Sequence, residues 1–252
     1  MQLSQPVYLN VRHAQVLHAS RRSKRLDLKW VAHLTTGVTS ASRYARTDRA
    51  DGTRDAILTA AEKLFAECGI ATVSNRQIVQ AAKQGNNAAV VYHFGKRADL
   101  VLAIEQQHAR HIEKLRQQKI AHTSESAGLQ DWVACLVEPF TSHLASLGKP
   151  SYYARFIAQA ATDPLYQSIV TKSALESPSL RQLVDNINDR LPQLPAHVRT
   201  ERNLMTRMML HHTCAVYESD MAEGRKGRRP SWRQVGRGLI DAIAAVWQAP
   251  VT

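Results

Sequence analysis

From residue 53 almost to the C-terminus, apolar side chains recur every three or four positions, which is the spacing of a helical face. The first such stripe follows a candidate N-cap, Thr53, and ends at Gly69; its members are Ile57, Ala61, Leu64, Phe65 and Cys68. Strand-like alternation never continues beyond about five residues. The pattern predicts an all-α protein of about nine helices.

Two further short helices are predicted directly after this stripe. Ser74 begins the first, with Gln77 three residues later completing a capping box. The turn 83–85 separates it from the next helix, which either Asn86 or Asn87 caps. Three short helices with a tight turn before the last one are typical of a helix-turn-helix, whose final helix enters the major groove of DNA.

The remainder of the chain keeps a helical pattern. A long helix is predicted from about residue 97 to 118, with Leu100, Ile104, His108, His111 and Leu115 on one side. Further helices follow at 129–147, 152–161, 165–175, 178–191, 198–223 and 231–248. The middle of 198–223 is apolar nearly all round, which predicts burial on every face.

Positive charge is concentrated at the start of the chain. The 252 residues include 33 Lys and Arg against 21 Asp and Glu, a net charge of +12. Residues 1–52 contribute +6, residues 53–118 contribute +3 and residues 119–252 contribute +3. Residues 1–50 lack an apolar period, so we expect a disordered basic leader with at most a short helix near 26–34. An organellar transit peptide and a start codon assigned too far upstream both fit this composition.

Other compositional features narrow the class of protein. No window approaches the roughly 18 uninterrupted apolar residues of a membrane span, and no signal-peptide pattern is present. Cys68, Cys135 and Cys214 are far apart and form neither a disulfide framework nor a zinc motif. We therefore expect a cytoplasmic protein without a cofactor or a metal, associated with the nucleoid when bound to DNA.

Several side chains around the predicted helix-turn-helix suit DNA contact. Asn86 and Asn87 can each pair bidentately with adenine, and the small Ala88 lets the helix approach base edges. Phosphate contacts need donors at the rim of the groove. The complete candidate set is Arg76, Asn86, Asn87, Ala88, Tyr92, His93 and Lys96. The alternative for each residue is capping or a solvated surface. Arg43, Arg46 and Arg49 could form an arm in the minor groove or a solvated linker.

Residues 53–100 resemble the DNA-binding domain of the TetR family of bacterial transcriptional regulators. The resemblance rests on Ala60-Ala61-x-x-Leu64-Phe65-Ala66-Glu67-x-Gly69, on Ser74-x-Arg76-x-Ile78-x-x-Ala81-Ala82, and on Tyr92-His93-Phe94-Gly95-Lys96 followed by Leu100. Two departures stand out. The turn from Ala82 to Ala88 is one residue longer than usual and resembles a subgroup whose recognition helix starts with two Asn. The usual tyrosine position is Val91, so Tyr92 lies about 100° further round the helix.

The resemblance implies an architecture with three parts: the leader 1–50, a DNA-binding domain 51–100 with its helix-turn-helix at about 74–95, and a helical effector-binding and dimerisation domain 101–252. It also implies a homodimer through the last two helices and a small-molecule effector that releases a repressor from a palindromic operator. Candidate effector contacts are Trp132, Phe140, Phe156, Met205, Met209, His212 and Tyr217. For all of them, and for Met208, core packing is the alternative.

Two other functions remain open on these residues. One is an all-α metal-assisted hydrolase that uses the C-terminal histidines. Separately, His108, His111 and His122 could be metal ligands, with interior or surface histidines as the alternative. Against a hydrolase, the chain has no H-E-x-x-H, no nucleophile elbow and no glycine-rich phosphate loop. The other is an architectural DNA-binding protein without an effector. The effector, the operator and the choice between repression and activation do not follow from the sequence.

Overall fold

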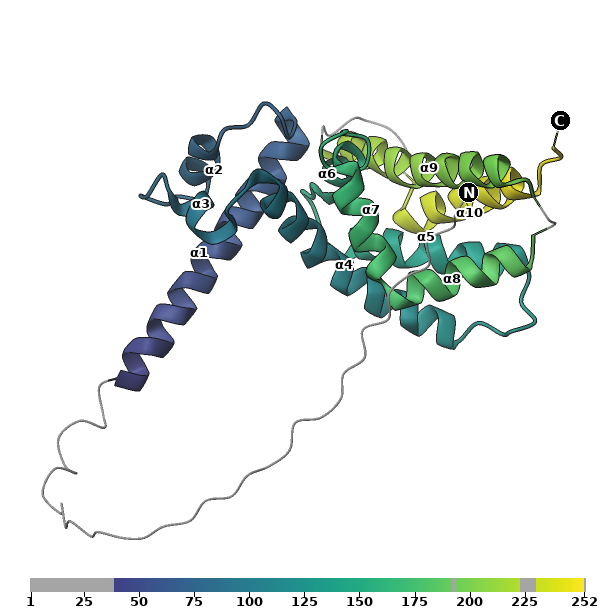
Figure 1. The fold of residues 1–252 in the computed structure, drawn as a ribbon, viewed down its shortest axis with the longest axis horizontal. Helices are drawn as coiled ribbons and strands as arrows, with labels where there is room; N and C mark the ends of the chain where they lie inside the picture. The colour runs from purple at the N-terminus through teal and green to yellow at the C-terminus, as the bar shows by residue number, and fades with distance from the viewer. Residues whose placement is uncertain (1–38, 192–193, 223–229, 252) are drawn as a thin grey trace, which may run out of the picture. The chain divides into compact units, whose positions relative to one another are not determined.

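The computed structural model describes residues 39–191, 194–222 and 230–251, and these ranges contain helices and no strand (Figure 1). The helices are α1 Thr39–Cys68, α2 Asn75–Ala81, α3 Ala89–Phe94, α4 Arg97–Ala121, α5 Leu129–Ser146, α6 Tyr153–Ala160, α7 Gln167–Glu176, α8 Pro178–Asp189, α9 Ala196–Ala222 and α10 Trp232–Gln248. The all-α prediction is confirmed, with ten helices in the described ranges instead of nine.

The chain divides into two units, residues 1–45 and 46–252. Of the first unit, the structure describes only the start of α1; the predicted short helix near 26–34 lies outside the described residues. All side-chain contacts reported below belong to the second unit.

The first helix begins much earlier than the sequence pattern predicted. Helix α1 starts at Thr39, so Thr53 is an interior residue and not an N-cap, and residues 39–50 are helical although they were expected to be disordered. Extending an existing helix costs little, because only the first turn bears the cost of nucleation. The polar residues 39–50 can therefore continue a helix that the buried stripe 57–66 stabilises. The backbone at Arg43, Arg46 and Arg49 is helical, and their side chains are outside the described set.

Helices α1, α2, α3 and the start of α4 form a small domain, here called the head. Its core is made of Ile57, Ala61, Phe65, Ile78, Val79, Val90, Phe94 and Leu100, all buried. The capping box at α2 is present as predicted: the Ser74 hydroxyl accepts from the Gln77 amide at 3.3 Å, and the Ser74 amide donates to Gln77 Oε1 at 2.8 Å.

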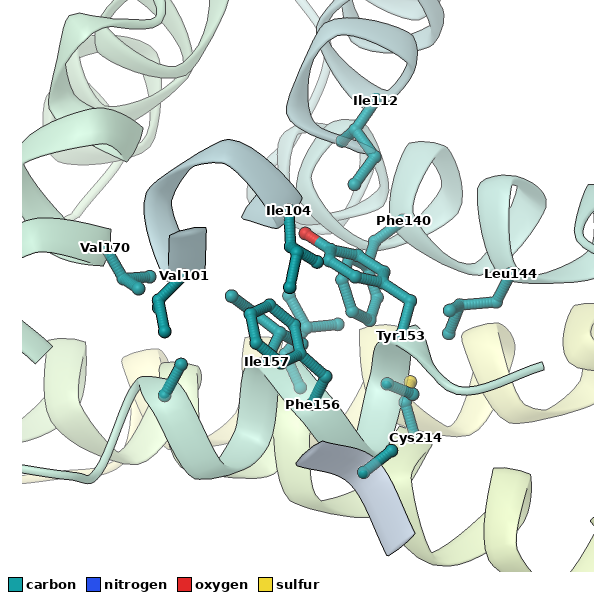
Figure 2. Close-up of a cluster of buried hydrophobic side chains, with 14 of the residues drawn as sticks. Val101, Ile104, Ile112, Phe140, Leu144, Tyr153, Phe156, Ile157, Val170 and Cys214 are labelled. Atoms are coloured by element: carbon teal, nitrogen blue, oxygen red, sulfur yellow. The ribbon is translucent and has the colours of Figure 1, made fainter. Parts of the chain in front are cut away.

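Helices α5–α10 and the rest of α4 form a second domain, here called the body. Helix α5 lies centrally and contacts α4, α8 and α10, while α9 packs against α6 and α10 (Figure 1). Side chains from α4, α5, α6, α7 and α9 meet in the buried cluster of Figure 2, which includes Phe140, Tyr153 and Phe156. None of the helices in the described ranges is both long and apolar enough to cross a membrane.

In the second half of α4, the buried residues are not the ones that the sequence pattern predicted. His111 is exposed and Leu115 is only half-buried, while Ile112, Arg116 and Ile120 are buried. A row of buried side chains therefore recurs every four residues along the whole length of α4. Because a helical turn has only about 3.6 residues, this row of side chains gradually moves round the helix. Helices α5, α7 and α8 all contact α4, so partners on different sides cover this row.

Helix α9 is not buried on every face, contrary to the prediction. Leu204, Met205 and Val216 are 48%, 49% and 60% exposed. Of the two adjacent histidines, His211 has its Nδ1 atom buried and His212 is exposed, so the expectation that His212 faces inward is wrong. A single chain cannot surround this helix, and its outer face is left apolar.

Candidate nucleic-acid interface and effector domain

In the turn of the helix-turn-helix, a lysine adopts the left-handed backbone conformation. Helix α2 ends at its C-cap Ala82, and Lys83 follows with φ of 54°. The Lys83 amide donates to the Gln80 carbonyl at 3.0 Å, and the Gln84 amide donates to the Val79 carbonyl at 3.0 Å. This pair of bonds is the Schellman motif, which usually has glycine where Lys83 stands. The turn is therefore ordered, at the cost of a side chain in an unfavourable backbone region.

The recognition helix begins later than predicted. Helix α3 covers only Ala89–Phe94, its N-cap is Ala88, and no side chain caps it, so the expected capping by Asn86 or Asn87 is wrong. The Asn86 side chain instead accepts from the Ala88 amide at 2.9 Å in an Asx turn. Asn87 is exposed and makes no side-chain hydrogen bond among the described residues. The two asparagines thus differ: the first shapes the turn, and the second is free to contact a ligand.

The remaining candidate DNA contacts lie largely on the surface of the head. Arg76, Asn87, Ala88 and Lys96 are exposed, and His93 is half-buried. Tyr92 is 81% exposed and its ring meets that of His93 edge-on at 5.0 Å. Exposed donors at both ends of α3 are what a groove-binding helix requires. Their contact with DNA stays a prediction.

Arg97 is a structural residue of the head that sequence reasoning did not identify. Its Nη2 donates to the Val73 carbonyl at 2.8 Å, and its guanidinium lies over the Phe65 ring at 5.2 Å. Burial lowers the pKa of Arg97. The side chain ties the start of α4 to the loop before α2, and so fixes the helix-turn-helix on the rest of the head. An arginine at a helix start carries no sequence signal for such a long-range bond.

The structure brings Phe140 and Phe156 into one buried cluster, but it places none of the predicted effector contacts around either cavity described below. Trp132, Phe140 and Phe156 are buried within the packed body, whereas Met205 and His212 are exposed. Met209 and Tyr217 are half-buried. Phe156 stacks on Phe65 of the head, with ring centroids 6.2 Å apart, so it also joins the two domains.

The cavities in the body are small or open. One of about 50 Å³ lies among α5, α8, α9 and α10, and its lining includes the polar residues Asn188, Asn203 and Thr206. A second, open hollow of about 580 Å³ lies against α7 and Arg207. Neither is lined by any predicted effector contact. The enclosed one is below the roughly 300 Å³ that a drug-sized ligand occupies.

The Nδ1 atom of His211 is one of the buried polar atoms of the body that lack a partner. It makes no hydrogen bond, and the His211 ring lies 5.6 Å from that of Phe140. Burial is the main reason that the pKa of His211 falls to about 4. A buried polar group without a partner is rare and calls for a ligand, a water or a functional explanation.

The histidines proposed as metal ligands are arranged differently from a metal centre. His108 and His111 both meet His143 of α5, while His122 is exposed at the end of α4 and bonds the Gln118 carbonyl. Among the residues that the structure describes, no group of three or more His, Cys, Asp or Glu is arranged to hold a metal ion. His143 is 35 residues from His108, so no local spacing predicts this cluster.

Comparison with known proteins agrees with the geometry of the head. Residues 57–104 match the family model described as bacterial regulatory proteins, tetR family. The head is therefore similar to the N-terminal domain of this family, and this likeness favours a transcriptional regulator over a hydrolase. It does not resolve the subgroup with two asparagines. No curated protein matches the chain in sequence.

Three solved structures share a weaker, overall likeness. The TetR-family regulator PfmR from Thermus thermophilus is 14% identical with a TM-score of 0.45, over 79% of this chain and 97% of that one. A protein from Mesorhizobium loti MAFF303099, described as a TetR-family regulator, is 16% identical with a TM-score of 0.45, over 80% and 99%. The multidrug binding protein EbrR, complexed with imidazole, is 15% identical with a TM-score of 0.43, over 79% and 92%.

Proposed function

We propose that this protein is a homodimeric repressor that binds a palindromic operator and leaves it when a small molecule binds the body. The observation that carries the proposal is the ordered helix-turn-helix with a free, exposed Asn87 at the start of α3. Amide side chains at this position suit adenine, and the donors Arg76, Tyr92, His93 and Lys96 suit phosphates on either side.

Dimerisation is supported by the outer faces of the last two helices. On α9, Met205, His212 and Val216 are exposed at spacings of seven and four residues, which is one helical face. On α10, Gly238 is exposed with open space where a side chain would lie. Helices α9 and α10 contact each other, and we infer that their outer faces together form the dimer surface. Burying such a surface against a second copy places two heads at a fixed separation.

Effector binding is supported by a polar atom that the body leaves unsatisfied. The buried His211 Nδ1 beside Phe140 offers one hydrogen bond in aromatic surroundings. The other candidates Trp132, Phe156, Met209 and Tyr217 stay proposals. The cavity among α5, α8, α9 and α10 holds only about 50 Å³, so an effector that enters there has to displace side chains. That displacement is a physical route by which binding moves α4 and the head.

The test starts with selection of bound duplexes from a random pool by the purified protein. We expect a palindrome whose half-sites lie about 34–36 Å apart, one turn of DNA. Replacing Asn86 and Asn87 together by Ala should reduce the preference for this site over random DNA more than it reduces total binding. The control replaces two adjacent exposed amides on α4, Gln106→Ala with Gln107→Ala. It should change neither the preference for the selected site nor total DNA binding. Binding without sequence preference, or an equal loss on random DNA, would overturn the proposal.

Dimerisation and release are tested separately. Val216→Glu should shift the protein towards monomer in sedimentation, while Leu165→Glu, at a residue that is 72% exposed, should not. A screen of small molecules for release of the operator addresses the effector. A protein that binds its operator but that no compound releases would be a ligand-independent DNA-binding protein.

A further inference from the structure

Four titratable side chains form an unbroken chain from the head into the body. Glu62 Oε2 of α1 lies 3.0 Å from His108 Nε2 of α4. His108 Nδ1 lies 2.8 Å from His143 Nε2 of α5, and His143 Nδ1 lies 2.7 Å from His111 Nδ1 of α4. His108 and His143 are buried, Glu62 is half-buried, and His111 is exposed. One end of the chain therefore meets solvent, and the other end is the link between α1 and α4.

Only one arrangement of protons satisfies this chain when all three imidazoles are neutral. The Glu62 carboxylate can only accept, so His108 carries its proton on Nε2. Its Nδ1 then accepts from Nε2–H of His143, and Nδ1 of His143 accepts from Nδ1–H of His111. Every contact has one donor and one acceptor. The exposed His111 is left with a free lone pair on Nε2.

We propose that these four residues form a proton relay that strengthens the attachment of α1 to α4 in acid. A proton from solvent binds Nε2 of His111. The Nδ1 proton of His111 passes to Nδ1 of His143, and the Nε2 proton of His143 passes to Nδ1 of His108. One proton has entered, and the two hydrogen bonds between histidines have reversed, while His108 Nε2–H still donates to Glu62. The positive charge lies on His108 beside the Glu62 carboxylate. His111 and His143 are again neutral.

The charges around the chain favour this end state. Glu62 from α1 and Glu105 from α4 interact directly with His108, and Tyr153 from α6 lies against it. Behind them, Glu176 from α7 interacts with Glu105, and Arg116 from α4 interacts with Tyr153. Tyr153 stacks on His108 with ring centroids 3.8 Å apart, and its burial raises its pKa well above the ordinary value, so it stays neutral. Burial and the two neighbouring histidines lower the pKa of His143 to about 3. A proton can therefore pass through His143 but does not remain there.

The consequence is mechanical. At neutral pH the link between α1 and α4 is a hydrogen bond from a neutral imidazole to a carboxylate. In acid it becomes an ion pair between two largely buried groups, whose side chains are 5% and 15% exposed. Since α1 belongs to the head and His143 to the body, the same proton sets how firmly the head is held.

The relay predicts an unusual titration for one residue. Nitrogen-15 spectra of labelled full-length protein should show neutral His143 with its proton on Nε2 at pH 7.5. As pH falls towards 5.5, His143 should remain neutral while its proton moves to Nδ1, and His108 should become charged. A His143 that keeps the Nε2 tautomer while His108 becomes charged, or that itself becomes charged, would overturn the relay.

Matched variants identify the two ends of the chain. Glu62→Gln removes the charge that holds the proton, so His143 should keep the Nε2 tautomer down to pH 5.5. Glu67→Gln, an exposed residue on the same helix, should leave the switch intact. His111→Gln should also abolish the switch, and His122→Gln, an exposed histidine of α4's C-cap, should not. If the change of tautomer persists in Glu62→Gln or in His111→Gln, the proposal is contradicted.

The mechanical consequence has its own measurement, and neither experiment needs DNA. Amide hydrogen exchange, corrected for intrinsic rates, should show α1 gaining about fivefold in protection relative to α10 between pH 7.5 and 5.5. Glu62→Gln should lose this gain. An unchanged ratio would refute the attachment role, whether or not the protein proves to be a DNA-binding repressor.

Discussion

Removing the Glu218 carboxylate should destabilise the body far more than removing an exposed carboxylate. Glu218 is 2% exposed on α9, and its oxygens accept from the Ala154 amide at 3.2 Å, the Arg155 amide at 3.0 Å and Arg155 Nε at 3.3 Å. Both amides lie in the first turn of α6 and have no partner inside that helix. A carboxylate there also interacts favourably with the helix dipole. This one side chain therefore joins α9 to the start of α6.

The magnitude follows from what Glu218→Ala leaves behind. Breaking a buried ion pair by removing one partner costs about 3–5 kcal/mol, largely because the remaining groups stay buried and unpaired. Arg155 keeps its bond to the Ser151 carbonyl at 3.0 Å and is partly exposed, which favours the lower half of that range. We expect a loss of about 3–4 kcal/mol.

The assay is urea unfolding at one fixed protein concentration, so that any coupled dissociation is the same for all variants. The matched control is Glu138→Ala, whose carboxylate pairs with Lys119 at 2.8 Å but is 47% exposed, and which should cost less than about 1 kcal/mol. If Glu218→Ala does not fold, the isosteric Glu218→Gln should still lose more than the control. Equal losses at the two positions would refute the assignment of α6's anchor to Glu218.

Three further outcomes follow from particular contacts. Asn87→Ala should reduce discrimination between the selected operator and random DNA by about 1–3 kcal/mol per half-site in binding assays. Asn86→Ala should instead lower stability and weaken binding to both kinds of DNA. If Asn86→Ala reduced discrimination more than Asn87→Ala, the Asx turn would be contradicted. Lys83→Gly should raise stability in thermal unfolding by about 1 kcal/mol, since glycine adopts φ of 54° without strain, and no gain would mean that the turn relaxes without cost. His211 has a pKa of about 4 when folded and near 6.5 when unfolded, so its contribution is complete above pH 6.5 and is lost as pH falls. Between pH 7 and 5, the free energy of unfolding of wild type should therefore fall by up to about 2 kcal/mol more than that of His211→Phe. Parallel pH profiles for the two proteins would refute this.

Local patterns were sufficient for most of the elements and for the position of the head. The capping box at Ser74 involves residues within three positions of each other, so their spacing predicts it. The helix-turn-helix could be predicted for the same reason. The start of α1 could not, because cooperative extension from a buried stripe leaves no local signal.

The candidate site was predictable only in part. Exposure of Asn87 and Tyr92 agrees with a role at a surface, since exposed polar residues beside a buried helical stripe follow from periodicity. The different roles of the two asparagines depend on one hydrogen bond from the Ala88 amide, which spacing does not determine. In the body, the sequence predicted Trp132, Phe140 and Phe156 as effector contacts or core residues. An effector site requires a cavity, which depends on all neighbouring helices together.

The helical class, the place of the helix-turn-helix head and the residue types that it exposes on its surface all follow from the amino-acid sequence alone. These properties depend on interactions over three or four residues, and such interactions can be read from spacing. Helix packing determines which of two adjacent histidines faces inward, which face of α9 stays open, and that Glu62, His108, His143 and His111 form one chain. Those four residues come from three helices and are up to 81 positions apart, from Glu62 to His143, so only the packing of α1, α4 and α5 could bring them into hydrogen-bond distance.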